Sequence, residues 1–444
     1  MAREDWDSPL EGSTSALGER VRLLRRSAGL SQSELASGRF SKEYVSQIER
    51  GRTRPTRETL EWLAERLDTD REFLEHGVSR AEAQRLAAEA DAAELLLEAH
   101  RYDEALTAFR SARLAAGAAP ALALRLLRGE AWALLRAGRL DEAMAVLDEA
   151  ASVAVSPGFA DVDRAEVVFL VGVVRYQQSR IDEAIVLLGE ALVLAEGSEE
   201  RSDRLRSDIF HWRARCHRRH RDWVAAEEDI QRAVELAEAI GDPRRLADAL
   251  FQASLVAQRQ GRWVLARTYA ERSRELFEQL GDEATTARLL NNLAGLNHLL
   301  GSPDRSVALL EEAFETFVEL DLPVDAGYVC SSLAEIRLDL GDAELAETQA
   351  RKALDLLGGR TDHLQEVGTA ELALGRSLAA QGRLDDAERW IVRAEETSER
   401  ASSASHRSSA WLARGDVESM RGNDEVAAGL YRRAARTLQE SELS

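Results

Sequence analysis

The sequence contains few prolines and cysteines and almost no lysine. Its 444 residues include seven prolines and two cysteines. Cys216 and Cys330 are too few and too far apart for a disulfide framework or a zinc site, so each is interpreted as a small apolar packing residue. The scarcity of proline, together with abundant Ala, Leu, Glu and Arg, predicts an all-α protein.

Long apolar runs are also missing. The longest uncharged apolar stretch, residues 167–174, falls far short of the roughly 20 residues that a membrane-spanning helix needs. The first ten residues carry no basic-then-apolar export signal. These features predict no membrane partner and a cytoplasmic location, and the scarcity of cysteine agrees with a reduced compartment.

The charge is unevenly distributed. Lys42 and Lys352 are the only lysines, and the formal net charge is −21. By itself this charge argues against a nucleic-acid partner. However, residues 17–57 hold ten Lys or Arg against four Glu, a net charge of +6. A short basic module is therefore attached to a long acidic body.

Two short helices with a tight turn between them are predicted in the middle of this module. A capping box of the S-x-x-E type opens the first helix at Ser31. Ser41 opens the second, which is expected to run from Lys42 to about Arg50. Gly51 should end it, because glycine tolerates the left-handed conformation found after helices.

Three further helices complete the module. An apolar helical face that begins at Leu17 predicts one helix before the pair, and two more are expected after Thr56. We expect the five helices to form one compact domain over residues 17–78. Residues 1–16 contain Gly, Ser, Pro and acidic residues without periodicity, which predicts a disordered tail.

The pattern formed by Gln32, Leu35, Ala36 and residues 41–55 resembles a known DNA-binding domain. It is similar to the lambda-repressor-like helix-turn-helix domain of the Cro and phage-repressor-like family, also called the xenobiotic-response-element family. In that family the second helix of the pair lies in the major groove. The resemblance implies base-edge contacts by Lys42, Glu43, Ser46 and Gln47. It implies contacts with the sugar-phosphate backbone of DNA by Gln32, Arg50, Arg52 and Arg54.

Alternatives to this assignment stay open for two groups of residues. Arg50, Arg52 and Arg54 could form an ordinary solvated charge run. Glu43 could be a solvent-facing helix former. The apolar side chains of the same stretch, among them Tyr44, are expected in a small core.

Beyond residue 78 the sequence repeats itself nine times. A turn followed by a small residue recurs at steps of 38 to 42 residues, as in GRLDEA and GRLDDA. Gly, Ala or Ser also occurs at two further positions of every unit. These positions lie twelve residues before and seven residues after the small residue of the turn. Two antiparallel helices per unit should approach closely there, and because one hairpin cannot bury its apolar face alone, the units should stack into a solenoid. The nine small residues, called anchors below, are Ala105, Ala143, Ala184, Ala226, Ala266, Ser306, Ala346, Ala387 and Ala427.

Residues 79–444 resemble the tetratricopeptide repeat, with units near 40 residues rather than that family's 34, so longer helices or turns are expected. The resemblance implies that the first helix of each unit lines a ligand groove. Amide, aromatic and arginine side chains at the implied positions suit a peptide or another small anionic ligand. Alternatively, they are solvated residues and ordinary packing between units. The groove positions are Arg128, Trp132, Arg136, Tyr176, Gln177, His211, Arg215, Arg219, Gln258, Arg259, Asn291, Asn292 and His298.

No catalytic, metal-binding or cofactor motif is visible. His211, His217 and His220 lie close together, but the arginines around them would oppose a metal cation. We therefore expect no enzyme activity and no cofactor.

The sequence predicts a DNA-binding transcriptional regulator. Double-stranded DNA is the expected partner of the basic module, and a peptide, small ligand or protein is expected in the solenoid. A homodimer is expected because related domains bind two half-sites. The arrangement resembles that of peptide-responsive bacterial regulators. The alternative is a protein-interaction scaffold in which the repeats recruit a partner and DNA binding is auxiliary or lost.

Overall fold

The structure is a computed structural model that describes residues 10–115, 120–156, 158–358, 363–401 and 403–443. Every secondary-structure element of these residues is an α-helix, which confirms the all-α prediction. The chain divides into two compact units, Met1–Arg221 and Asp222–Ser444, and each is described by itself. This division falls within the repeats, whereas the change from short helices to long hairpins lies between α5 and α6.

The first five helices form the helix-turn-helix domain. The first helix begins at Leu10 rather than at Leu17, so part of the expected tail is helical. Residues 1–9 of that tail lie outside the described residues. The bounds are α1 Leu10–Ser27, α2 Gln32–Ala36, α3 Lys42–Glu49, α4 Arg57–Arg66 and α5 Arg71–His76.

Both predicted helix starts in the helix-turn-helix are confirmed. The Ser31 backbone N–H donates to Glu34 Oε2 (2.7 Å) and the Glu34 N–H donates to Ser31 Oγ (3.2 Å), which completes the capping box. Ser41 Oγ accepts from the Tyr44 N–H at 3.1 Å. Gly51 follows α3 with a φ of +69°, the left-handed conformation expected there.

The core of this domain joins α1 to the helix pair. Leu35, Val45 and Ile48 are at most 1% exposed, as the apolar pattern predicts, whereas Tyr44 is half-buried at the edge of the core. A Cβ at Gly18 of α1 would lie 2.4 Å from the Ile48 carbonyl oxygen. The backbones of α1 and α3 therefore approach closely only because residue 18 has no side chain.

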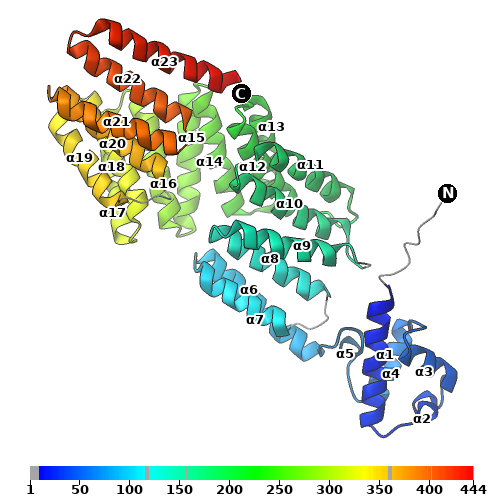
Figure 1. Ribbon diagram of the computed structural model, residues 1–444. Helices are drawn as coiled ribbons and strands as arrows, with labels where there is room; N and C mark the ends of the chain where they lie inside the picture. The colour runs from blue at the N-terminus through cyan, green and yellow to red at the C-terminus, as the bar shows by residue number, and fades with distance from the viewer. Residues whose placement is uncertain (1–9, 116–119, 157, 359–362, 402, 444) are drawn as a thin grey trace, which may run out of the picture. The chain divides into compact units, whose positions relative to one another are not determined.

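The repeats of the first unit begin with three helical hairpins. In each hairpin the two helices pack against each other, and consecutive hairpins are also in contact (Figure 1). The bounds are α6 Arg80–Glu98, α7 Tyr102–Ala115, α8 Pro120–Arg136, α9 Leu140–Ala154, α10 Asp161–Gln177, α11 Ile181–Gly197 and α12 Asp203–Arg219.

The second unit begins with α13, the sequence partner of α12, and continues with five hairpins. Their helices pack in the same alternating order as in the first unit. The bounds are α13 Trp223–Ile240, α14 Pro243–Arg259, α15 Trp263–Gln279, α16 Glu283–Leu299, α17 Pro303–Glu319, α18 Pro323–Asp339, α19 Ala343–Leu357, α20 Leu364–Ala380, α21 Leu384–Arg400, α22 Ala404–Met420 and α23 Asp424–Leu443.

The small residues lie where the repeat pattern places them. All nine anchors, and all the residues twelve before and seven after them, are buried. At the serine anchor, Ser306 Oγ donates to the Ala294 carbonyl oxygen on the partner helix at 2.7 Å. A Cβ at Gly415 would lie 2.4 Å from the Tyr431 ring. The small side chains thus permit the close approach of the two helices in a hairpin.

From α14 to α18 the long repeat period comes from the helices and not from the connections. Each of these helices has 17 residues. Only three residues connect successive helices there, for example residues 260–262 and 280–282. A longer connection occurs at residues 198–202, between α11 and α12. Of the two expected sources of extra length, longer helices are therefore the one found from α14 to α18.

Candidate nucleic-acid interface and ligand face

The helix α3 presents a polar surface opposite its buried face. Lys42, Glu43 and Gln47 are exposed and Ser46 is half-buried, while Val45 and Ile48 anchor the opposite side. These four polar residues therefore share the accessible side of the helix. The Thr53 hydroxyl donates to the side-chain oxygen of Gln47 at 3.1 Å, which fixes the orientation of that amide.

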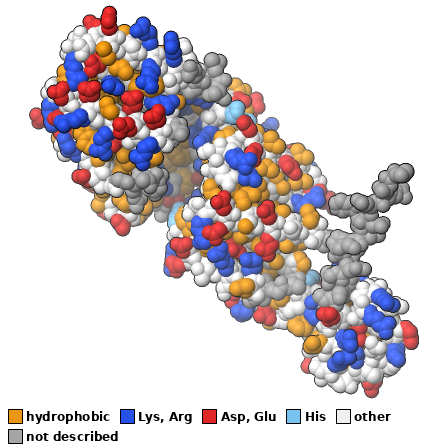
Figure 2. All heavy atoms as spheres, in the orientation of Figure 1, with side chains coloured by type: hydrophobic (Ala, Val, Ile, Leu, Met, Phe, Trp, Pro, Cys, Tyr) orange, Lys and Arg blue, Asp and Glu red, His pale blue; other side chains and the backbone are white. Residues whose placement is uncertain are grey.

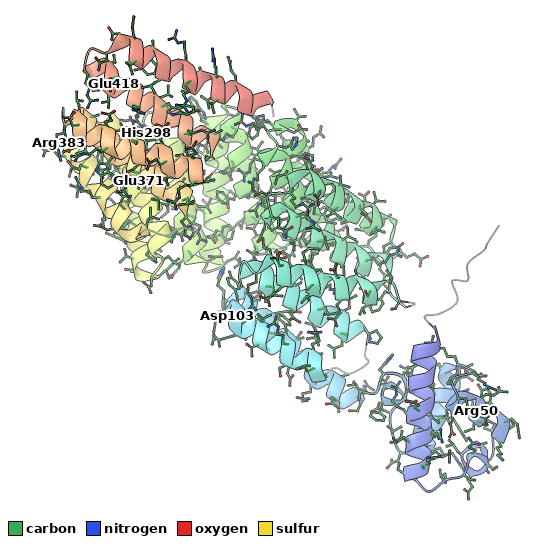
Figure 3. The ribbon with its side chains drawn as sticks, viewed as in Figure 1. Arg50, Asp103, His298, Glu371, Arg383 and Glu418 are labelled. Carbon is green, nitrogen blue, oxygen red and sulfur yellow. The ribbon has the colours of Figure 1, made fainter. Side chains whose placement is uncertain are left out.

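Three arginines extend this surface beyond the end of α3. Arg50 is the C-terminal cap of the helix, and Arg50, Arg52 and Arg54 are all exposed. No ion pair is found for these three among the described residues. Figure 3 labels Arg50 on this domain, and Figure 2 shows several Lys and Arg side chains on the face turned to the viewer. A cationic surface thus continues from the side of α3 that faces outward.

A buried ion pair lies directly behind this surface. Arg25 of α1 donates to Glu49 of α3, with Nε 2.5 Å from Oε1 and Nη2 3.2 Å from Oε2. Gln32 of α2 donates its amide to Glu49 Oε2 at 2.7 Å. One amide hydrogen of Gln32 is therefore used inside the domain. The expected contact of Gln32 with the DNA backbone would have to use its second amide hydrogen.

Sequence reasoning missed Arg25 and Glu49. Burial alone would raise the pKa of Glu49, but hydrogen bonds from Arg25 and Gln32 outweigh it, and the pKa lies below its usual value. A signal existed in the sequence, because Glu49 follows Val45 by four residues and so falls on the buried face of its helix. A carboxylate at such a position requires a buried partner.

In both units the even-numbered helices of successive repeats lie next to one another, for example α8 with α10, α10 with α12 and α16 with α18. We call the side of the even-numbered helices that bears the predicted groove residues the ligand face. It is described separately for each unit.

On α8 and α10 of the first unit, some of the predicted groove residues form contacts within the protein and others are exposed. Arg128 forms ion pairs with Asp163 and Glu166, so it is not free to bind a ligand. Burial raises the pKa of Glu166, although the Arg128 charge opposes that effect. Arg136 is exposed, and its Cζ lies 5.5 Å from the Trp132 ring centroid. Gln177 is also exposed.

Two arginines of α12 pack against aromatic rings of α10 and α12. The Arg215 Cζ lies 4.2 Å from the Trp212 ring centroid and 5.1 Å from that of Tyr176. Arg219 lies over the Tyr176 ring at 5.5 Å. Cation–π contacts of this kind contribute about 0.5–2 kcal/mol each, depending on desolvation. The His211 ring lies 6.1 Å from Trp212, a member of the cluster that the predicted positions did not include.

On the second unit the ligand face is rich in amides. The Asn292 Nδ2 lies 3.5 Å from Gln258 Oε1, at the long limit of a hydrogen bond. The Oδ1 atoms of Asn291 and Asn292 are buried and have no hydrogen-bond partner among the described residues. His298 (labelled in Figure 3) already has a partner, because its Nε2 lies 2.9 Å from Asp339 Oδ2. Arg259 is exposed.

Neither a metal site nor a membrane-spanning helix is found in the described part of the chain. Within the described ranges no group of three or more His, Cys, Asp or Glu side chains is placed to hold a metal ion. In the same part of the chain, none of the helices combines the length and the apolar character needed to span a bilayer.

Comparison with family models identifies the two kinds of domain. Residues 16–77 match a model described as a helix-turn-helix domain. Models of the tetratricopeptide repeat match residues 90–158, 205–279, 245–317 and 372–441. The chain is a helix-turn-helix protein with tetratricopeptide repeats. The predicted combination is thereby confirmed, while the xenobiotic-response-element subfamily stays a prediction.

Known structures with a similar fold come from several proteins. The apo form of RapI has a TM-score of 0.62 at 12% identity, with 80% of this chain and 99% of that chain covered. The apo form of the quorum sensor NprR from B. thuringiensis has a TM-score of 0.61 at 12% identity and the same coverage. A Rap protein complexed with Competence and Sporulation Factor has a TM-score of 0.60 at 14% identity, with 81% and 98% covered. At these identities the likeness shows the fold of this helix-turn-helix protein.

One curated relative matches part of the chain. The Photosystem I assembly protein Ycf3 of Parasynechococcus marenigrum (strain WH8102) is 34% identical over 89 residues, which make up 19% of this chain. The match spans about half of that relative's length, 51%. Because the match covers only part of each chain, nothing about the relative's activity carries over.

Proposed function

We propose that this helix-turn-helix protein is a sequence-specific transcriptional regulator whose repeats sense a ligand. The observation that supports this most directly is the outward polar side of α3. Lys42, Glu43 and Gln47 lie on it, anchored from behind by Val45 and Ile48. A short helix of this kind fits the major groove, which presents a distinct hydrogen-bonding pattern for each base pair.

The exposed side chains of α3 can form hydrogen bonds that distinguish one base pair from another. Lysine donates to guanine, glutamine bonds adenine at two atoms, and glutamate accepts from cytosine. Arg50, Arg52 and Arg54 at the end of the helix suit phosphate oxygens, which fix the position of the protein but carry no sequence information. Lys42, Glu43 and Gln47 would then supply specificity, and the arginines affinity.

The amides of the second unit suit an extended peptide. Asn291, Asn292 and Gln258 offer donors and acceptors to a peptide backbone, and two buried amide oxygens have no hydrogen-bond partner in the described part of the chain. The names of the similar structures point the same way, since one Rap structure contains Competence and Sporulation Factor and NprR is called a quorum sensor. A peptide or small ligand bound here would modulate DNA binding.

We further propose a homodimer that acts in the cytoplasm. One domain with a single short recognition helix makes few phosphate contacts, and two copies on a palindromic site would double them. The negative charge of the repeats would keep the solenoid away from the DNA.

Mobility shift with selected genomic fragments tests the proposal. We expect a retarded band whose affinity falls steeply with salt and depends on sequence. Loss of the band in the Gln47→Ala, Lys42→Ala double variant, with unchanged thermal stability, would support the assignment of α3. If no band forms even at low salt, the chain is instead a protein-interaction scaffold.

A further inference from the structure

Two arginines on α12 share one aromatic ring. Arg215 and Arg219 are four residues apart, and their Cζ atoms lie 5.1 Å and 5.5 Å from the Tyr176 ring centroid. Trp212 lies edge-to-face with Tyr176 at 5.5 Å. Both rings are only 8% exposed. Two like charges therefore lie side by side against the buried rings of Tyr176 and Trp212.

Among the described residues, neither Arg215 nor Arg219 has a carboxylate at ion-pair distance. Arg215 is half-buried, and its Nε has no hydrogen-bond acceptor in the described part of the chain. By contrast, Arg175 of the same unit forms an ion pair with Glu183, and Arg206 forms ion pairs with Asp203 and Glu196. Within the described ranges, these two neighbouring cations therefore lack a counter-ion at ion-pair distance.

We propose that Arg215 and Arg219, with Tyr176 and Trp212, form an oxyanion-binding site. The site would take a carboxylate or phosphate attached to an apolar or aromatic body. This inference deepens the proposed ligand-sensing role and rests on it for its biological purpose.

The chemistry of the four side chains selects such a ligand. A guanidinium stacked on a ring keeps its N–H edge available, and that edge matches the two oxygens of a carboxylate or phosphate. Side chains four residues apart on a helix repel each other when they carry the same charge, so an anion between them removes an unfavourable interaction. Only 8% of each aromatic residue is exposed, so the apolar part of the ligand would contact that exposed edge of the rings.

The same helix offers a matched control. Arg206 also lies on α12, but it forms ion pairs with Asp203 and Glu196. If any arginine of this helix could bind the anion, Arg206 would do so as well.

Calorimetric titration of the full chain tests the site with defined probes. The probes are 3-phenylpropionate, phenyl phosphate and the neutral 3-phenylpropionamide. We expect both anions to bind and the amide not to bind. In Arg215→Gln the affinity should fall by about tenfold or more, because a charge-assisted bidentate contact is lost. Arg206→Gln should bind like the unmodified protein, and equal melting temperatures would show that the variants are folded.

Two further arms distinguish the source of the anion. An alanine-rich hexapeptide that ends in phenylalanine is titrated with a free carboxylate and with an amidated end. Tighter binding of the free-acid peptide than of 3-phenylpropionate assigns the site to a peptide terminus. Equal binding assigns it to a small organic acid.

The proposal is overturned if neither anion binds, if the amide binds as tightly, or if Arg215→Gln leaves the affinity unchanged. These outcomes are independent of the mobility shift that tests DNA binding. Anion binding without any retarded band would keep the site and reject the regulator.

Discussion

The Arg25 guanidinium and the Glu49 carboxylate tie α1 to α3 at the base of the recognition surface. Their Nε and Oε1 atoms are 2.5 Å apart, and the two residues are 8% and 7% exposed. Arg25 also donates from Nη1 to the Leu30 carbonyl oxygen at 2.7 Å. Because Glu49 directly precedes Arg50, this pair positions the end of the helix that is proposed to meet DNA.

Removing one member of the pair should destabilise the helix-turn-helix domain. Glu49→Ala leaves the Arg25 charge buried without its partner, which costs about 3–5 kcal/mol. Hydrogen exchange of α1 and α3 in the full chain measures the effect locally. Glu43→Ala, on the exposed side of the same helix, should change stability by less than about 0.5 kcal/mol.

The double variant Arg25→Met, Glu49→Leu separates the charge from the packing. Since no unpaired charge remains, we expect it to be more stable than Glu49→Ala alone. If the double variant is less stable than Glu49→Ala, the Arg25–Glu49 pair stabilises the domain by more than the cost of burying its two charges.

The stability of this domain should fall in acid. The pKa of Glu49 in the folded protein lies below its usual value, so the stabilisation is complete above the unfolded pKa of about 4.3 and is lost as the pH falls through the lower folded value. Circular dichroism cannot isolate five helices, so exchange at α3 is followed from pH 6 to pH 3. Glu49→Gln should flatten this pH dependence, and an unchanged slope would contradict the assignment.

Glu371 on α20 should behave in the opposite way. Glu371 is labelled in Figure 3. It is 1% exposed, and burial raises its pKa although Thr397 donates to Oε2 at 2.8 Å and Arg393 lies 3.1 Å from Oε1. A folded pKa above the unfolded one means that stability decreases as the pH rises through that interval. Glu371→Gln keeps an acceptor for Thr397 and should not lower the melting temperature at pH 7. A marked loss of stability at pH 7 would show that the Arg393 pair dominates.

Base-reading and phosphate-binding side chains should differ in their salt dependence. Lys42→Ala or Gln47→Ala should cost about 1–3 kcal/mol of specific binding and relax the preference at one base pair. Arg52→Ala or Arg54→Ala should weaken binding to all sequences and reduce the salt slope by about 1. Affinities measured at several salt concentrations, on the preferred fragment and on a scrambled one, separate the two classes. The reverse assignment would follow if the arginine variants changed sequence preference.

The sequence predicted the repeated elements better than the contacts of single polar residues. The anchors and their flanking small residues form a periodic signal, and each of them is buried as expected. The partners of Arg128 and His298 could not be read in the same way, because Glu166 and Asp339 come from the next repeat and their reach depends on how the repeats stack. The contact between Trp212 and Arg215 could not be predicted either, because it depends on the orientation of two side chains on one helix.

Small residues at the hairpin contacts should be intolerant of even one added methyl group. In Gly375→Ala the new Cβ would lie 2.5 Å from Ile391 Cγ1 and 3.2 Å from the Ala387 carbonyl oxygen. Since Ile391 is fully buried, relieving the clash requires movement of a packed helix, at a cost of about 1–3 kcal/mol. The melting temperature of the variant should therefore fall.

Gly189→Ala is the matched control, because residue 189 lies within α11 and a Cβ there would meet nothing within 4 Å. Alanine is favoured over glycine inside a helix by about 0.5–1 kcal/mol, so this variant should be slightly stabilised. Opposite changes in melting temperature would show that the glycine at position 375 is needed for close packing of α20 on α21. If both substitutions stabilise the protein, the contact at Gly375 is looser than the short Cβ distances require.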